Sequence, residues 1–454
     1  MKNKNTKQYT MKKILLLLVA FASITQVHAQ DDNSAFSLKQ AIEFAMINQP
    51  NVKNAQLDES IAKNKVEEII GIGTPQINAS ADINKFIKIP TSFVPAEFFG
   101  GSSGEFFAVQ FGQAYTASAG ITATQLLFDG SYIVGLQASK TYMELSRKST
   151  IQTKTETAVN VSKAYYGALV ADASLLIIDA NIERVKKLYN DTKALNDNGL
   201  VEKIDVDRLE LTLNNLKVEK EKVARFKLLS YALLKFQMGF ANSKALTLTD
   251  KLDESVLVVT NLADSIDYTK RPEYGVVNIQ RQLQALDLKR MKAGYLPSLV
   301  AFGTASANAS RNDFNIFNTD YRWFPTVIAG LRLNVPIWDG LQRKSQISQS
   351  KLTLQKVDNA ITLMKNGFAL DYENAKATYS NNLSSLKIVK KNQDLAKEIS
   401  RVSKIKYESG IGSSLEVIDA ESSVKEADAN YFNTLYETII SKIDLDKSTG
   451  SITF

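Results

Sequence analysis

Prolines stand at only eight positions in this chain of 454 residues, and their spacing limits what the rest can fold into. They occupy positions 50, 75, 90, 95, 272, 297, 325 and 336, so residues 96–271 and 337–454 contain none. Because proline removes a backbone donor and clashes with the preceding turn, these stretches are open to uninterrupted helices. Residues 131–196 and 341–407 are rich in Ala, Leu, Lys, Glu and Gln. We expect each to form one helix of about 66 residues, roughly 100 Å long.

Apolar spacing also predicts long packed helices. Leu209, Leu213, Leu216 and Val223 follow a 4-3-7 series, and Leu395, Ile399 and Val402 repeat the 4-3 step. Such spacing is typical of the buried seam between paired helices. We therefore expect both sets to lie between helices of a coiled-coil type.

The N-terminal segment has the pattern of a secretory signal peptide. Lys12 and Lys13 precede nine apolar residues, 14–22, and the small-residue site Val27-His28-Ala29 follows. This pattern predicts a signal peptide over residues 1–29, with Met1 or Met11 as the start. The apolar run is too short to span a bilayer as a helix. No later apolar run approaches 18 residues, so we expect no transmembrane helix downstream.

Charge and composition exclude several classes of function. The formal net charge is +7, but five lysines lie in the first thirteen residues, and without them cations exceed anions by only two. A nucleic-acid-binding surface is therefore not expected.

Cysteine is absent, and the single histidine, His28, lies in the predicted signal peptide. Thiol chemistry, disulfides, His/Cys metal sites and Ser-His-Asp triads are thereby excluded from residues 30–454. We expect no catalytic residues, no cofactor and no metal. A carboxylate-only enzyme stays open as a minor alternative, but the acids show no sign of converging in a cleft.

The sequence contains an approximate internal duplication. Pro50 and Pro75 are separated like Pro272 and Pro297, and Phe128-Asp129-Gly130 is echoed by Trp338-Asp339-Gly340. The expected layout is a first repeat over 30–240, a linker over 241–271 and a second repeat over 272–454. Each repeat would run through a helix, two strands, a long helix, a tip turn and a return helix.

Four segments alternate in polarity like membrane barrel strands. Residues 327–337 place Val, Ala and Leu on one face, whereas Arg332 and Asn334 lie on the other. Residues 115–122 alternate similarly, and 76–88 and 298–310 complete four strands, with an exposed loop at 90–112. Four strands cannot close a barrel, and open edges are not tolerated in lipid, so this interpretation requires oligomerisation. The alternative is an exported periplasmic coiled-coil scaffold without a pore.

In its order of elements the chain resembles the TolC-type outer-membrane channel family. Residues 41–50 resemble the family's N-terminal helix, which ends near Asn-Pro, and the two hydrophobic-Asp-Gly turns match its strand ends. Residues 410–420 resemble its hairpin tip. The resemblance covers residues 30–454, and the doubling of these motifs is more specific than any one of them.

The resemblance implies an α+β membrane protein, with long antiparallel helical hairpins and four strands per protomer that complete a twelve-stranded barrel in a homotrimer. It implies a location in the bacterial outer membrane, in contact with its lipid and extending into the periplasm. Such a protein is not an enzyme. It would be the exit channel of a tripartite efflux or type I secretion system, with a periplasmic adaptor and an inner-membrane pump of RND or ABC type as partners.

Residues at the hairpin tips are the candidate functional sites that follow from the resemblance. Glu416 and Asp419 would form acidic rings at the narrow end of the pore, although Glu416 also fits a capping box that begins at Ser413. Asp205 matches the gate-holding acid, with an ordinary solvated first-turn acid as the alternative.

Tyr407 matches the tyrosine that ties the two hairpins, and we expect it to hydrogen bond with Asp205. Gly412 stands where the family pattern has a basic residue, so an Arg–Asp link is not expected there.

The two tip turns are the expected adaptor contacts. Gly199 and Gly410 suit the left-handed ends of helices. Leu200 and Ile411, which adjoin them, have little core to fill at a tip, and they complete the predicted contact.

Overall fold

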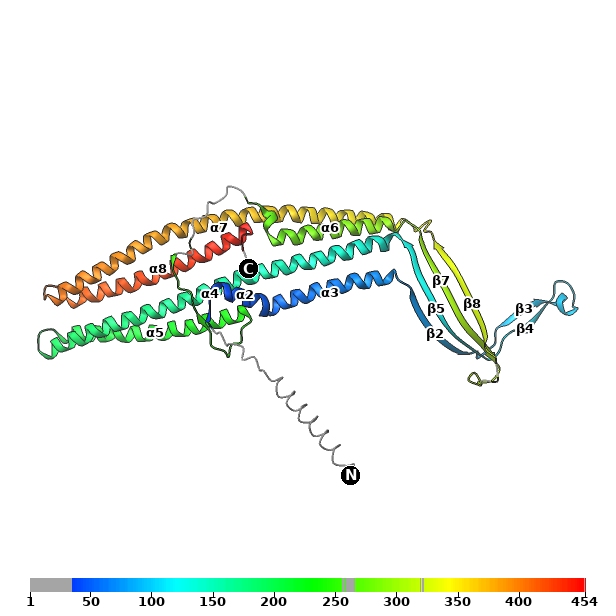
Figure 1. Cartoon of the computed structure of the whole chain (residues 1–454), viewed down its shortest axis with the longest axis horizontal. Helices are drawn as coiled ribbons and strands as arrows, with labels where there is room; N and C mark the ends of the chain where they lie inside the picture. The colour runs from blue at the N-terminus through cyan, green and yellow to red at the C-terminus, as the bar shows by residue number, and fades with distance from the viewer. Residues whose placement is uncertain (1–34, 255–256, 258–265, 319, 321, 453) are drawn as a thin grey trace, which may run out of the picture. The chain divides into compact units, whose positions relative to one another are not determined.

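The structure is a computed structural model that describes residues 35–254, 257, 266–318, 320, 322–452 and 454. The predicted signal peptide, residues 1–29, lies outside the described residues. The elements in chain order, of which Figure 1 labels all but β1, η1, β6 and η3, are β1 (Ala35–Phe36), α2 (Leu38–Asn48), α3 (Pro50–Ile72), β2 (Gln76–Lys85), β3 (Thr91–Pro95), η1 (Ala96–Phe99), β4 (Phe106–Gln110), β5 (Tyr115–Asp129), α4 (Gly130–Asp197), α5 (Lys203–Met238), β6 (Thr247–Leu248), η3 (Tyr268–Lys270), α6 (Pro272–Ala293), β7 (Ser298–Arg311), β8 (Phe324–Asn334), α7 (Gln342–Glu408) and α8 (Ser414–Thr449).

The two long helices are confirmed. The helix α4 has 68 residues and α7 has 67, and each bound lies one residue from the prediction. Both begin at the hydrophobic-Asp-Gly turns, where the aspartate acts as an N-terminal cap. Asp129 Oδ1 accepts from the Tyr132 N–H at 2.8 Å, and Asp339 Oδ2 accepts from the Arg343 N–H at 3.3 Å. The shared motif therefore has a local structural cause.

The chain divides into two compact units, each assembled from segments far apart in the sequence. One unit contains Asn160–Val256 and Ile388–Tyr436 together with the segment that ends at Ala45. The other contains Met46–Val159, Leu257–Lys387 and Glu437–Phe454. We call them the hairpin unit and the sheet unit. The element order repeats as a helix, strands, a long helix and a return helix, while the predicted repeat boundaries stay a prediction.

The sheet unit holds a four-stranded antiparallel sheet in the order β2-β5-β7-β8. All four strands were predicted, with different ends: β2 stops at Lys85, β5 continues to Asp129, and β8 runs from Phe324 to Asn334. Because β2 and β8 are at the ends of this order, each leaves one edge unpaired as far as the structure describes the chain.

The register gives this sheet two chemically different faces. Residues directly opposite each other in antiparallel strands share a face. One face carries small and apolar side chains: Ile77, Ala79, Ala81 and Ile83 from β2; Ala117, Ala119, Ile121 and Ala123 from β5; Leu299, Ala301, Gly303, Ala305, Ala307 and Ala309 from β7; and Val327, Ala329, Leu331 and Leu333 from β8. At one end this face finishes in a row of Lys85, Tyr115 and Arg311.

The opposite face is mostly hydroxyl and amide. It carries Asn78, Ser80, Asp82 and Asn84; Thr116, Ser118, Thr122 and Thr124; Thr304, Ser306, Asn308 and Ser310; and Thr326, Arg332 and Asn334, with Leu126, Val300, Phe302, Phe324 and Ile328 as its larger apolar members. Thr122 and Thr304 hydrogen bond across β5 and β7 at 3.2 Å. The predicted alternation of β8 thus extends in register over all four strands.

The segment 90–112 is not a plain loop as expected. The strands β3 and β4 form an antiparallel hairpin, and η1 follows β3 (Figure 1). Pro95 closes β3 opposite Phe106, a position where a missing N–H is tolerated. The prolines and glycines of this segment concealed the short strands in the sequence. The expected exposure is present, because Phe93 is 72% and Phe98 is 78% exposed.

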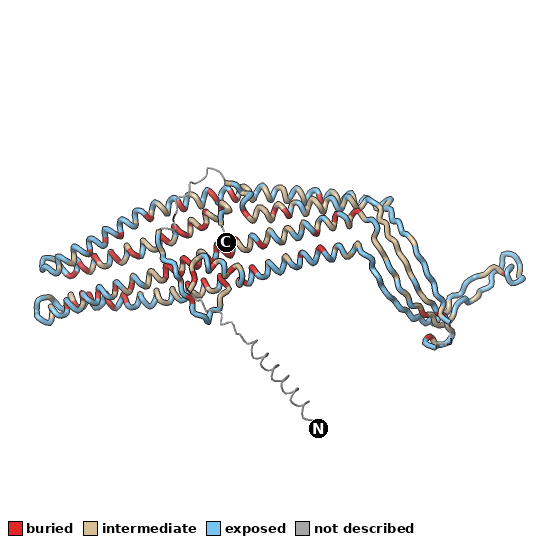
Figure 2. The backbone as a smooth tube through the Cα atoms, viewed as in Figure 1, coloured by how far each residue is buried: buried red, intermediate tan, exposed pale blue. Residues whose placement is uncertain are grey.

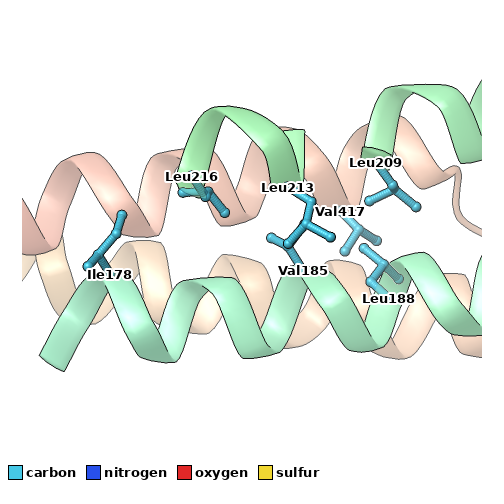
Figure 3. Close-up of a cluster of buried hydrophobic side chains, with 7 residues drawn as sticks. All are labelled: Ile178, Val185, Leu188, Leu209, Leu213, Leu216 and Val417. Carbon is cyan, nitrogen blue, oxygen red and sulfur yellow. The ribbon is translucent and has the colours of Figure 1, made fainter. Parts of the chain in front are cut away.

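The core of the hairpin unit lies between α4, α5 and α8. Ile178, Val185 and Leu188 from α4 pack with Leu209, Leu213 and Leu216 from α5 and with Val417 from α8 (Figure 3). The first predicted seam is thus confirmed for its three leucines, while Val223 is half-buried.

The second predicted seam is not buried in the single chain. Leu395, Ile399 and Val402 are 57%, 49% and 39% exposed. The buried residues of this stretch of α7 are instead Gln393, Ala396 and Ser400, on another side of the helix. The 4-3 spacing identified an apolar stripe correctly but not what covers it.

Figure 2 shows how little of the sheet is buried in the single chain, in contrast to the recurring buried positions along the helices. Every residue of β2 is exposed. By length and hydropathy, one helix of the described residues, α4, contains a window that could cross a membrane, which the sequence did not lead us to expect. Since 56% of that window is buried, its apolar residues have protein neighbours already.

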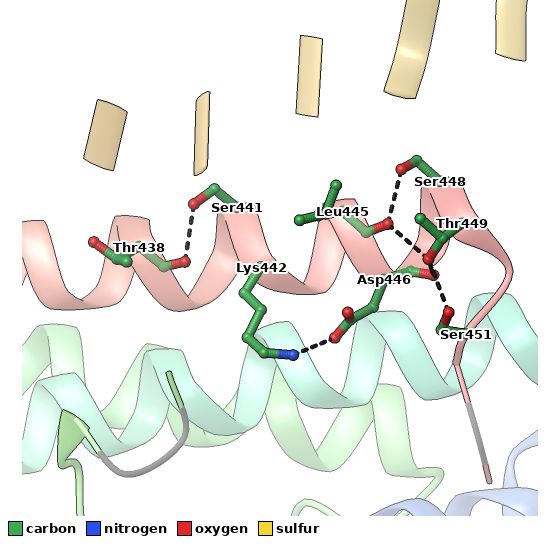
Figure 4. Close-up of polar contacts among 8 residues, drawn as sticks. All are labelled: Thr438, Ser441, Lys442, Leu445, Asp446, Ser448, Thr449 and Ser451. Atoms are coloured by element: carbon green, nitrogen blue, oxygen red, sulfur yellow. Dashed lines mark hydrogen bonds and ion pairs between the residues drawn. The ribbon is translucent and has the colours of Figure 1, made fainter. Parts of the chain in front are cut away.

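The last turns of α8, in the sheet unit, use small hydroxyl residues (Figure 4). Ser441 donates to Thr438 O at 2.9 Å and Ser448 donates to Leu445 O at 2.7 Å, so both buried hydroxyls are satisfied within the helix. Lys442 pairs with Asp446 at 2.7 Å on the same helix. Small, internally bonded side chains allow close packing without unsatisfied polar groups.

Candidate gate at the hairpin tips

Both tip turns are where the sequence placed them. Gly199 and Gly410 have φ values of 74° and 75°, the left-handed region in which glycine avoids the clash of a Cβ. Leu200 N–H donates to Leu195 O at 2.9 Å, and Ile411 N–H donates to Lys406 O at 3.1 Å, which closes each helix end. Leu200 and Ile411 are 71% and 80% exposed. Two apolar side chains therefore project from the tips without a core.

Ser413 caps the start of α8, and both candidate pore acids, Glu416 and Asp419, are exposed to water. Ser413 Oγ accepts from the Glu416 N–H at 3.2 Å. The Glu416 and Asp419 side chains lie on exposed positions of the first two turns. Acids near a helix N-terminus are favoured by the helix dipole, so the local structure alone accounts for their presence.

Gly412 is held tightly by the turn that precedes it. A Cβ at this position would lie 3.0 Å from both Lys406 Cβ and Tyr407 N. A longer side chain would press on this backbone, which gives a physical reason for glycine where the family pattern has a basic residue.

Asp205 and Tyr407 both join the first hairpin to the second, but not through each other as expected. Tyr407 on α7 hydrogen bonds with the buried Thr192 of α4, with 3.0 Å between the hydroxyl oxygens. Asp205, in the first turn of α5, accepts from Ser414 Oγ of α8 at 2.5 Å and lies 3.7 Å from Arg208. The prediction of a direct Asp205–Tyr407 bond is therefore wrong. Tyr407 precedes its tip and meets α4, whereas Asp205 follows its tip and meets α8.

Two ion pairs away from the tips also connect the hairpins. Arg184 Nε of α4 lies 2.9 Å from Glu421 Oε2 of α8, and Ser400 of α7 donates to the other Glu421 oxygen at 2.7 Å. Lys425 Nζ of α8 lies 2.5 Å from Glu219 Oε2 of α5. Sequence reasoning missed these residues, since Glu421 and Lys425 have the i, i+4 spacing that usually predicts a pair within one helix.

A third polar contact fixes the segment before the undescribed residues 255–256. Glu254 Oε1 accepts from Lys390 Nζ of α7 and from the Tyr431 hydroxyl of α8, both at 2.8 Å. The Lys390 ammonium, followed by the Tyr431 hydrogen bond, holds the pKa of Glu254 below its usual value against the opposing effect of burial. Burial in turn raises the pKa of Tyr431.

The sheet and the helical hairpins together indicate a class of protein. A two-faced strand layer and long helical hairpins with polar ties between them are typical of conducting proteins of the outer membrane. Residues 277–451 match the family described as outer membrane efflux protein. Over these residues, which make up less than half of the chain, the sequence is similar to outer membrane efflux proteins.

Individual relatives agree over nearly the whole chain. The outer membrane protein TolC of Vibrio cholerae is 21% identical over 447 residues, which cover 97% of this chain and 96% of that protein. Among solved structures, CusC has a TM-score of 0.73 at 15% identity, covering 91% of this chain and 92% of its own.

The MtrE outer membrane channel of Neisseria gonorrhoeae, solved in its open state, has a TM-score of 0.69 at 16% identity, and the match covers 91% of this chain and 88% of MtrE. At this identity the structures establish the fold. That fold is the α+β arrangement of TolC-like channels, with helical hairpins joined to strands.

Proposed function

We propose that three copies of this chain form an outer-membrane exit channel, which passively conducts substrates delivered by a periplasmic adaptor and an inner-membrane pump of RND or ABC type. The observation that carries this proposal is the two-faced, four-stranded sheet with two open edges. A single layer of strands has both faces satisfied when the apolar face meets lipid and the polar face meets a water-filled lumen. A pore-less scaffold gives the apolar face no role.

The open edges determine how copies would join. In lipid, unpaired backbone groups are costly, so β2 and β8 each require a partner strand. Pairing β2 of one copy with β8 of the next is a head-to-tail contact, and such contacts generate a ring when the rotation between copies closes. The resemblance to TolC-type channels is our reason for choosing three copies, which supply twelve strands, over two.

The uncovered apolar stripe supports the same assembly within the hairpin unit. Leu395, Ile399 and Val402 of α7 continue to Ile388, which is 63% exposed. On α5, Leu211 and Val218 are 63% and 55% exposed. Neither stripe is covered by the described part of its own chain, and contact with a neighbouring copy would remove both from water.

The gate follows from the contacts at the tips. The Thr192–Tyr407 and Asp205–Ser414 hydrogen bonds hold the second hairpin against the first, and in three copies Glu416 and Asp419 would form acidic rings at the periplasmic end. Such rings favour cations and bind multivalent ones. Opening would require the ties between hairpins to break.

The adaptor is expected to contact the exposed Leu200 and Ile411 beside Gly199 and Gly410. A photo-crosslinking residue placed at Leu200 or at Ile411 in living cells tests this contact, with Leu176 as a matched control position. Leu176 is 72% exposed on α4, away from the tip.

Capture of an adaptor from the tips but not from Leu176 supports the proposal. The co-purifying pump, proton-driven or ATP-driven, would identify the class of system. Recovery of the protein in the water-soluble fraction without any adaptor would refute the proposal and favour the scaffold.

A further inference from the structure

Arg332 of β8 is the single cation on the polar face of the sheet, as far as the described strands extend. It lies opposite Val300 of β7, near the end of the sheet where β8 leads to α7. Two acids share this face: Asp82 of β2 lies in the row of Ser118 and Asn308, toward the other end, and Asp129 of β5 lies in the end row of Ser298 and Asn334. Asp82 is therefore separated from Arg332 along the strands, whereas Asp129 Oδ1 accepts from the Tyr132 N–H at the start of α4.

An aromatic ring positions the Arg332 guanidinium. Its central carbon lies 5.3 Å from the centroid of the Phe302 ring, within the range of a cation–π contact. The Phe302 ring in turn lies across Gly330, where a Cβ would come within 3.0 Å of the ring. Gly330 thus leaves room for the Phe302 ring. Arg332 lies two residues after Gly330 on the same face of β8, where the ring supports its guanidinium.

The Arg332 side chain is exposed, and no carboxylate of the described residues forms an ion pair with it. A planar guanidinium supported by a ring, rather than by an acid, keeps its donors available for an anion.

We propose that Arg332, supported by Phe302, is a specificity-determining residue of the barrel wall that favours anionic groups in passing solutes. This inference rests on the proposed function, because the trimeric barrel would bring three copies of Arg332 around one lumen. Rings of cationic side chains favour anions in pores. The preference is opposite in sign to that expected of Glu416 and Asp419, so the two ends of the channel would select differently.

The test uses the absence of native cysteine from the chain. Asn334→Cys places a thiol two residues from Arg332 on the same face, about 7 Å along the strand. Leu333→Cys places the matched thiol on the apolar face. Both variants are purified as detergent complexes, and their labelling rates are measured with an anionic sulfonate and a cationic trimethylammonium thiol reagent of similar size.

We expect Asn334→Cys to be labelled and Leu333→Cys to be shielded by detergent. In the Asn334→Cys background, Arg332→Gln should lower the anion-to-cation rate ratio about threefold at physiological salt, as expected for a few screened charges at this distance. Arg332→Lys should preserve the ratio.

The inference fails, and the proposed function stands, if Asn334→Cys is labelled and Leu333→Cys is shielded but Arg332→Gln leaves the anion-to-cation rate ratio unchanged. If both thiols react equally well, the barrel itself is absent, and the proposed function fails together with the inference.

Discussion

Asp205 and Ser414 join the starts of the two return helices across 209 residues of sequence, with Asp205 Oδ1 accepting from Ser414 Oγ at 2.5 Å. The contact places one carboxylate of the first hairpin on the first residue of α8. In the proposed channel the second hairpin cannot swing away from the first while this bond exists. It is therefore the most direct candidate for a latch.

Removal of this latch should favour the open state. A hydrogen bond to a charged group contributes about 1.5–3 kcal/mol, so Ser414→Ala should shift the closed-to-open ratio roughly tenfold or more per protomer. Single-channel conductance in planar bilayers would show longer or more frequent open events. Asp207→Asn is the control, since this exposed acid lies on the same helix. Equal effects of Ser414→Ala and Asp207→Asn would contradict the latch.

Loss of the Arg184–Glu421 pair should also favour the open state, but less than loss of the Asp205–Ser414 bond. Arg184 is 41% exposed, so water screens the pair. We expect Glu421→Gln to increase the open fraction modestly and Arg184→Ala to add little further, as measured by a double-mutant cycle on conductance.

The Lys220–Asp179 pair provides the control for this cycle. It has a 2.6 Å distance but links α5 to α4 within one hairpin. Asp179→Asn should leave conductance unchanged. If it opens the channel as much as Glu421→Gln does, loss of charge rather than the link between hairpins is responsible.

The exposed stripe on α7 should determine assembly rather than folding of the single chain. Leu395→Lys introduces a charge where the proposed trimer buries an apolar side chain, so trimers should dissociate in detergent while helical content by circular dichroism is kept. Asp394→Lys, at an exposed neighbouring position on another side of α7, is the control. Stable Leu395→Lys trimers would show that this stripe is not in the interface.

The contact of Glu254 with Lys390 and Tyr431 should depend on pH. Because the pKa of Glu254 is lowered in the folded state, the contact stabilises the fold above the ordinary value of 4.5 and loses this effect as pH falls through the lowered value. Hydrogen exchange of the peptide over residues 246–254, corrected for intrinsic rates, should accelerate below about pH 4.5. Glu254→Gln should show the faster exchange already at pH 7, and a profile identical to that of the wild type would contradict the assignment.

Local sequence patterns were sufficient for the elements of the fold. The lack of proline predicted α4 and α7 to within one residue at each end, and glycine chemistry placed both tips. The aspartates of the two hydrophobic-Asp-Gly turns mark helix starts because they cap them. Alternation in 327–337 predicted a face that the register then extended over four strands.

Patterns could not identify partners. The 4-3 spacing of Leu209 and that of Leu395 look alike, yet only the first is buried within the chain, because spacing records an apolar stripe and not its neighbour. Tyr407 pairs with Thr192, and Arg184 with Glu421, across more than 200 residues. The hairpin β3–β4 was missed because glycine and proline obscure short strands.

The central claim is that three copies close one barrel with the polar sheet face inside. Native mass spectrometry of protein extracted from outer membranes tests it most directly. The account predicts a detergent-dependent complex of three times the protomer mass that yields discrete conductance steps in a planar bilayer. A water-soluble monomer recovered without detergent would contradict it.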